Sequence, residues 1–112
     1  MTDRPEPTMA QKALGNYAPT LAHLTDEVLF ADVWARPELS RRDRSLITVA
    51  ALVAGGNTEQ LRGHLALAKT NGVTEAEVEE AFTHLAFYAG WPRAMSACAV
   101  ARSVFGEEDN QS

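Results

Sequence analysis

The apolar run LITVAALVA, residues 46–54, sets the strongest limit on how this chain can fold. Placed on a helix, the run is apolar on every side, and such a helix has to be covered on all its faces by other parts of the protein. It therefore predicts the central helix of an all-α fold. A short chain has few helices with which to cover it, so the run also favours an oligomer over a monomer.

The composition bounds the class of protein. The 112 residues are 46% hydrophobic with only 7 glycines and 5 prolines, which is typical of one folded domain and not of a disordered chain. We expect a single domain over 1–112, with flexible ends at 1–8 and 106–112. The net charge of −5 provides no positive field for phosphates or anionic lipids, so nucleic acid and membrane are disfavoured as partners.

Export and thiol chemistry are also disfavoured. The segment MTDRPEPTMAQK lacks the apolar core of a signal peptide, and no window is apolar over the length of a membrane span. Cys98 is the only cysteine, which excludes an intrachain disulfide and a cysteine-based zinc site and fits the cytoplasm. It stands among small residues in AMSACAVA, where we expect it to be packed. The sequence predicts no metal site.

Start and stop signals predict the other helices. Ser40-Arg-Arg-Asp43 and Thr74-Glu-Ala-Glu77 have the spacing of a capping box. Asn71-Gly72 and Gly90 mark helix ends, and Pro92 begins a new helix. The result is a bundle of five to six helices. We predict helices over 20–34, 41–54, 58–70, 75–89 and 92–104, with a further turn or two near 9–16.

The predicted helix 75–89 carries a polar stripe. Glu80, His84 and Tyr88 recur every four residues and so share one face. An acid beside an imidazole holds its proton and orientation, so Glu80 could tune His84 as a general acid or base, with Tyr88 lining the same cleft. A solvated acid and a histidine at the edge of the core would give the same spacing, and spacing alone favours that interpretation.

His64 is a separate candidate. Its neighbours one helical turn away, Leu61, Leu65 and Ala68, are apolar, which predicts a ring that is at least partly buried. Burial lowers or tunes the pKa of a histidine in a way that suits proton transfer near neutrality. A histidine that only completes the core remains the alternative.

The basic segment RPELSRRDR, 36–44, surrounds the N-terminus of the central helix, where free amides and the helix dipole favour an anion. An arginine there, Arg36 or the better-placed Arg44, could bind a carboxylate through two hydrogen bonds. Arg41 and Arg42 are expected in ion pairs. Trp34 is expected in the core or at the rim of a pocket.

Three stretches together resemble the carboxymuconolactone decarboxylase family: VWARPELSRRDRSLITVAAL, HLALAKTNGVTEAEVEEA and HLAFYAGWPRAMSA. The resemblance covers about residues 28–105. It implies the all-helical fold of the alkyl hydroperoxidase D proteins, assembled as a homo-oligomer, a trimer or a hexamer. It further implies a decarboxylase without cofactors, acting in aromatic catabolism on a small anionic substrate such as 4-carboxymuconolactone or another unsaturated lactone or keto acid.

Relatives with the same fold act as peroxidases through a C-x-x-C-x-x-x-H centre. In this sequence the histidine position is His64, while the cysteine positions are Asn57 and Gln60 and the upstream glutamate position is Ser45. The resemblance therefore speaks against a disulfide-cycling peroxidase.

The decarboxylase interpretation assigns roles to the candidate residues. His64 would transfer the proton or stabilise the oxyanion, Arg44 would hold a carboxylate, and Glu80 with His84 would be a second acid–base pair. Tyr88, Trp34 and Arg36 would contact the substrate. Two alternatives stay open: a non-catalytic oligomeric protein that binds a small anion or a partner protein, and a one-cysteine peroxidase that uses Cys98.

Overall fold

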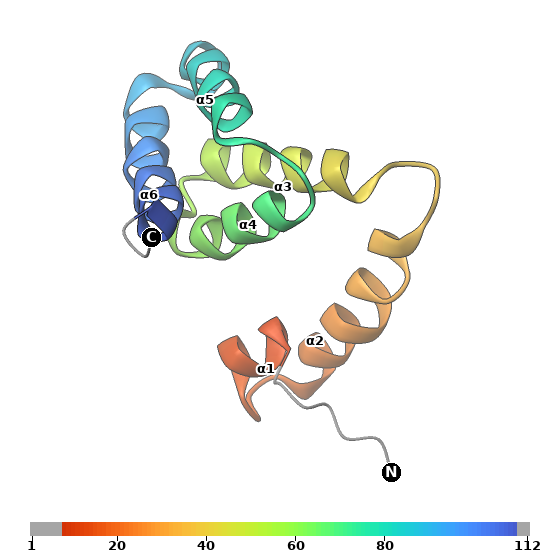
Figure 1. Ribbon diagram of the computed structural model, residues 1–112. Helices are drawn as coiled ribbons and strands as arrows, with labels where there is room; N and C mark the ends of the chain where they lie inside the picture. The colour runs from red at the N-terminus through yellow and green to blue at the C-terminus, as the bar shows by residue number, and fades with distance from the viewer. Residues whose placement is uncertain (1–7, 110–112) are drawn as a thin grey trace. The chain divides into compact units, whose positions relative to one another are not determined.

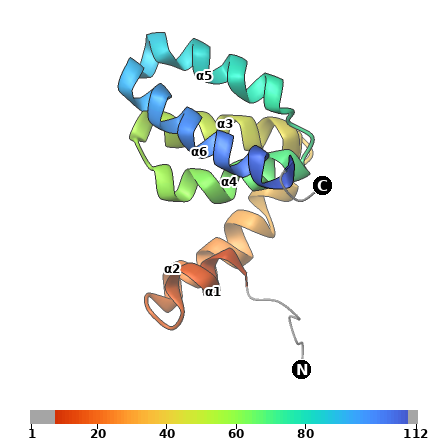
Figure 2. The same ribbon diagram turned by 60° about the vertical axis from the view of Figure 1, so that its left-hand side comes forward.

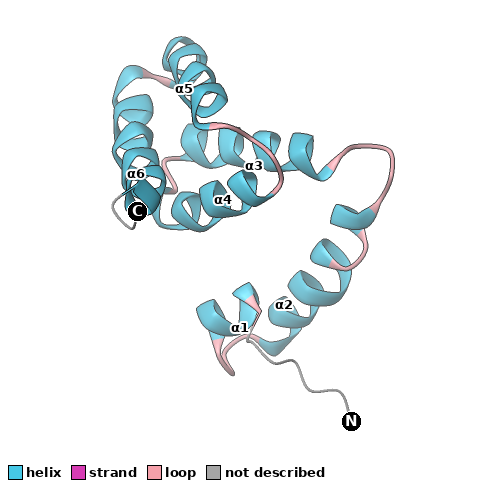
Figure 3. Cartoon of the chain, in the orientation of Figure 1, coloured by secondary structure: helices cyan, strands magenta, loops and turns pink. Residues whose placement is uncertain are grey.

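The computed structural model describes residues 8–109, and all regular structure in that range is helical (Figure 1, Figure 3). The chain divides into two compact units, one ending at Leu39 and the other beginning at Ser40. The predicted all-α class is confirmed. None of the helices in the described range is long and apolar enough to cross a membrane.

The first unit contains short helices. Helix α1, Met9–Leu14, begins at a complete capping box formed by Thr8 and Gln11. Helix α2, Pro19–His23, continues into a π-helix, η1 (Leu24–Phe30), which is followed by the 3-10 turn η2 (Val33–Ala35).

The single helix predicted over 20–34 is therefore wrong in its detail. Within it the hydroxyl of Thr25 donates a hydrogen bond to the carbonyl of Leu21, and the N–H of Ala31 reaches back five residues to Asp26. The same threonine bond forms at Thr48, Thr70 and Thr83 within regular α-helices, so it does not by itself account for the π-helix. Apolar periodicity does not distinguish the two helix types over so short a segment.

The second unit is a bundle of four helices: α3 (Arg41–Gly55), α4 (Thr58–Thr70), α5 (Glu75–Ala89) and α6 (Trp91–Asp109). Their order and starts agree with the prediction. In both views α5 and α6 run side by side, while α3 packs against α4 and α5 (Figure 1, Figure 2). Helix α6 continues five residues beyond the predicted end at 104, so residues 106–109, expected to be flexible, are helical. The expected flexible residues 1–7 and 110–112 lie outside the described range.

Local signals explain the helix boundaries. The Thr74 hydroxyl accepts from the N–H of Glu77, and the Glu77 carboxylate accepts from the N–H of Thr74, which completes the predicted capping box. At Ser40 only the hydroxyl half of the box forms, because the Asp43 carboxylate lies toward Arg42 instead. Gly72 and Gly90 follow α4 and α5 with φ of +99° and +107°, a region that glycine enters without steric cost.

The core of this bundle lies where α3, α4, α5 and α6 meet. Its largest fully buried side chains are Phe82, Leu61, Leu65, Val49, Val53 and Val78. Helix α3 was predicted to be covered on all sides, yet Ile47 is 59% exposed, and Ala51 and Ala54 are also exposed. Within the second unit, α3 is therefore buried on the side that carries Val49 and Val53 and exposed at Ile47, Ala51 and Ala54.

Candidate active site

A groove of about 450 Å³ between α3 and α5 is lined by two of the predicted catalytic residues, Glu80 and His84. Both are on α5 and exposed to solvent. The floor of the groove is apolar, and its polar groups stand at the rim. Its complete lining is Arg42, Leu46, Ala50, Glu77, Glu80, Ala81, His84 and Leu85. The groove can accept a small molecule with an apolar body and ionic groups.

An ion pair between Arg42 and Glu77 joins the first turn of α3 to the first turn of α5 at this groove. The backbone N–H of Thr74 and the guanidinium of Arg42 lower the pKa of the Glu77 carboxyl, the hydrogen bond from Thr74 being the larger cause. The prediction that Arg42 forms an ion pair is confirmed. Its place in the groove was not predicted, because the two partners are 35 residues apart in the chain.

Tyr88 stacks on His84, with the ring centroids 4.8 Å apart and the planes inclined by 27°. The predicted polar stripe therefore exists on α5 as a continuous face. Tyr88 itself is 79% exposed and is not among the residues that line the groove. Its contact with a substrate stays a prediction.

His64 lies on α4 between the buried side chains of Leu61, Leu65 and Ala68. Its side chain is half-buried, as predicted, and its Nδ1 atom is buried. Burial lowers the pKa of the imidazole below its ordinary value of 6.5, because the charged form loses hydration. The neutral ring is therefore favoured at neutral pH. His64 does not line the groove between α3 and α5.

Ser45 connects α3 to the end of α4. Its side chain is fully buried, and its hydroxyl oxygen accepts a hydrogen bond of 2.9 Å from Nδ2 of Asn71. This residue stands at the position that the resemblance matches with a glutamate. An alcohol in place of a carboxylate removes a proton acceptor from this part of the core, while the bond to Asn71 satisfies the buried oxygen.

Three other predicted residues lie near the junction of the two units in the sequence. Arg44 is half-buried in the first turn of α3, and its carbonyl accepts from the hydroxyl of Thr48. Trp34 and Arg36 belong to the first unit, where Trp34 is 5% exposed and stacks on Phe30. Arg36 is exposed after the 3-10 turn. Substrate contacts by these residues stay predictions.

Cys98 is exposed on α6, so the prediction that it is packed is wrong. The buried face of this helix is formed by Ala94, Ala97 and Ala101, and position 98 falls beside that face. In AMSACAVA nearly every residue is small, so the sequence does not indicate which face is buried. Among residues whose side chains are described, no three His, Cys, Asp or Glu are grouped so that they could hold a metal ion.

Comparison with known proteins finds a matching family model and relatives, two of which are named decarboxylases. The model of the "Carboxymuconolactone decarboxylase family" matches residues 19–103. The chain is 43% identical over 76 residues to 4-carboxymuconolactone decarboxylase from Acinetobacter baylyi, covering 68% of this chain and 57% of that protein. It is 36% identical over 84 residues to a nitrosuccinic acid decarboxylase from Metarhizium robertsii, covering 75% of this chain and 59% of that one.

The chain covers a larger share of a third relative. An uncharacterized 15.0 kDa protein from Paracoccus denitrificans is 30% identical over 102 residues, which is 89% of this chain and 76% of that protein. The two named decarboxylases are longer, and the chain spans less than two thirds of either.

Proposed function

The chain belongs to the carboxymuconolactone decarboxylase family, and from this membership we propose that it is a carboxy-lyase that works without a cofactor. Its substrate would be a small unsaturated lactone or keto acid, with 4-carboxymuconolactone as the first candidate. The names of two relatives that act as decarboxylases on different acids support the reaction class more strongly than any one substrate.

The chemistry of such a substrate explains why the protein's own side chains suffice. When carbon dioxide leaves, the electron pair of the broken carbon–carbon bond delocalises onto the carbonyl oxygen of the unsaturated lactone. The protein then has to orient the carboxylate, stabilise the negative oxygen and return a proton to carbon.

The observation that carries the proposal is the half-buried imidazole of His64, with its buried Nδ1 atom, within the segment that the family model matches. A neutral imidazole can donate a hydrogen bond from its N–H to the enolate oxygen. To return a proton to carbon, the ring must first take up a proton from solvent, and a lowered pKa makes the resulting imidazolium the stronger acid. We assign the proton transfer or the oxyanion contact to His64 and the binding of the carboxylate to Arg44.

Glu80 and His84 are proposed as the second acid–base pair. They line one groove with an apolar floor, which suits the ring of a small acid. Arg42 stands at the same rim, paired with Glu77. Arg44 does not line this groove, and its contact with a substrate carboxylate is proposed from its place in the first turn of α3.

We further propose a homo-oligomer, a trimer or a hexamer, in the cytoplasm; the exposed apolar side chains support the association. Several large apolar residues on α3, α5 and α6 are exposed, and their burial would favour association. They are Ile47, Phe87, Tyr88, Trp91 and Met95. Sedimentation velocity would give the assembly size, and a monomer at micromolar concentration would contradict this part of the proposal.

The reaction itself is tested by incubating the purified protein with 4-carboxymuconolactone while carbon dioxide release and substrate absorbance are followed. We expect turnover above the buffer rate and formation of the enol-lactone of 3-oxoadipate. If this substrate is not consumed, nitrosuccinic acid and a panel of keto acids test the wider class. Failure on all of them would favour the non-catalytic alternative, and a peroxide assay on Cys98 would test the peroxidase alternative.

A further inference from the structure

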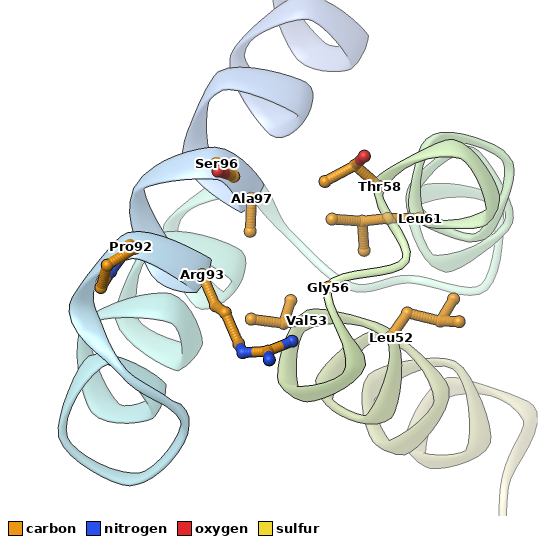
Figure 4. Close-up of a pocket in the computed structure, with 9 residues that line it drawn as sticks. All are labelled: Leu52, Val53, Gly56, Thr58, Leu61, Pro92, Arg93, Ser96 and Ala97. Carbon is orange, nitrogen blue, oxygen red and sulfur yellow. The ribbon is translucent and has the colours of Figure 1, made fainter.

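A second cavity, of about 410 Å³, lies at the C-terminal end of α3, where α3, α4 and α6 meet (Figure 4). Its size falls within the roughly 300–1,000 Å³ that is typical of small-molecule sites. It shares no lining residue with the groove between α3 and α5, and none of the residues predicted to be catalytic lines it. The proposed decarboxylation therefore leaves this cavity without a role.

The inner wall of the cavity is made of core residues. Val53, Leu61 and Ala97 line it and are 2%, 0% and 1% exposed, so packing on their far sides holds them in place. Leu52 and Pro92 extend the apolar surface. A wall built from packed core side chains is formed before any ligand arrives, which lowers the entropic cost of binding.

The polar groups of the cavity suit an anion. Figure 4 shows the side chain of Arg93 reaching from α6 toward Gly56, with Ser96 and Thr58 on the facing walls. A Cβ atom on Gly56 would lie 2.7 Å from Nη1 of Arg93, so the guanidinium rests directly against this glycine. No carboxylate is among the lining residues.

These groups are available to a ligand. In the part of the chain that the structure describes, the side chains of Arg93, Ser96 and Thr58 form no hydrogen bond or ion pair. Thr58 is also the first residue of the 13-residue helix α4, and the side chain of Asn57 does not cap that helix. The positive end of the α4 dipole thus adds to the charge of Arg93.

We propose that this cavity binds a small organic carboxylate with an apolar body, such as an aromatic or short aliphatic acid. The carboxylate would accept hydrogen bonds from the Arg93 guanidinium and from the hydroxyls of Thr58 and Ser96, and the hydrocarbon part would lie against Val53, Leu61 and Ala97. One guanidinium beside a mainly apolar wall matches a monoanion better than it matches inorganic phosphate, which has no apolar surface to bury.

Binding of benzoate to the full chain, followed by NMR chemical shifts and by calorimetry, tests this inference without any need for turnover. We expect saturable shifts at Thr58, Ser96 and Ala97. Benzamide and phosphate should each bind at least about tenfold more weakly than benzoate. Benzamide has the same shape but lacks the charge that Arg93 would bind, and phosphate lacks the apolar surface that the cavity wall would cover.

Arg93→Gln should weaken benzoate binding by about tenfold or more, and Thr58→Val by a smaller factor, while both variants keep the native unfolding temperature. Arg102→Gln is the matched control, because it removes an exposed arginine from the same helix at a position that does not line the cavity.

Benzoate-induced shifts that map to His84 and Glu80 would overturn the inference. So would an Arg102→Gln variant that weakens benzoate binding as much as Arg93→Gln does, or phosphate that binds as tightly as benzoate. A protein that binds benzoate here but releases no carbon dioxide would refute only the proposed function.

Discussion

The guanidinium of Arg42 on α3 pairs with the carboxylate of Glu77 on α5, and Thr74 donates a backbone hydrogen bond to the same carboxylate. The Glu77 side chain therefore completes the cap of α5 and links that helix to the start of α3. Both partners also line the groove that holds Glu80 and His84. The Glu77 carboxylate thus contributes both to the cap of α5 and to the rim of the groove.

This arrangement predicts a loss of stability in acid. The pKa of Glu77 is lowered from 4.5 in the folded protein, so as pH falls the unfolded chain takes up the proton first. The stabilisation by Glu77 is present above pH 4.5 and is lost as pH falls through the lowered pKa. Urea unfolding across this range should show a weaker acid dependence in Glu77→Gln than in the native protein. An unchanged dependence would contradict the proposed role.

Removal of the α5 cap should destabilise the fold directly. Thr74→Ala takes away the hydroxyl that accepts from the N–H of Glu77, and loss of such a cap costs about 0.5–2 kcal/mol of the free energy of unfolding. Thr83→Ala, at an exposed position within the same helix, should stay within about 0.5 kcal/mol. Equal effects of the two substitutions on the urea midpoint would show that the cap makes no specific contribution.

The hydrogen bond between Ser45 and Asn71 is expected to hold α4 against α3. Ser45→Ala removes the buried acceptor of this part-buried bond, and an intramolecular hydrogen bond contributes about 0.5–1.5 kcal/mol to the free energy of unfolding. Ser96→Ala, at an exposed position, should change the free energy of unfolding by less than about 0.5 kcal/mol. Thermal unfolding of both variants compares the two sites, and a Ser45→Ala protein as stable as the native one would be inconsistent with this bond.

The burial of His64 predicts a second pH dependence of the free energy of unfolding, separate from that of Glu77. Its folded pKa is lowered from 6.5 by burial, so below pH 6.5 the unfolded chain binds a proton that the folded protein resists. This contribution to stability is present above pH 6.5 and is lost as pH falls from there through the folded pKa. Substitution by Gln should flatten the pH dependence in that window. A titration of the ring by NMR with a pKa at or above 6.5 would contradict this lowering of the pKa.

Much of the fold followed from local chemistry. The serine and threonine caps, the glycines after α4 and α5 and Pro92 act within a few residues. They therefore indicated the starts of α3, α5 and α6 to within one residue and the ends of α4 and α5. The π-helix of Leu24–Phe30 was missed because the apolar pattern of seven residues does not distinguish a π-helix from an α-helix.

The candidate site was predicted less completely. Four-residue spacing placed Glu80, His84 and Tyr88 on one face, and apolar neighbours indicated the burial of His64. Spacing could not show that Arg42 and Glu77 meet, nor that Cys98 is exposed, since both depend on how separate helices pack. The cavity beside Arg93 was also not predicted, because its walls come from three helices whose packing the spacing does not show.

The assignment of the proton transfer to His64 is tested most directly by the kcat/KM of His64→Ala, with His84→Ala as the matched comparison, on whichever acid the native protein decarboxylates. We expect His64→Ala to lower kcat/KM by about 100-fold or more, as is typical for the loss of a general acid–base group, without a change in assembly size. His84→Ala should have the smaller effect. A loss of less than about threefold for His64→Ala, or a larger loss for His84→Ala, would contradict the assignment of the proton transfer to His64.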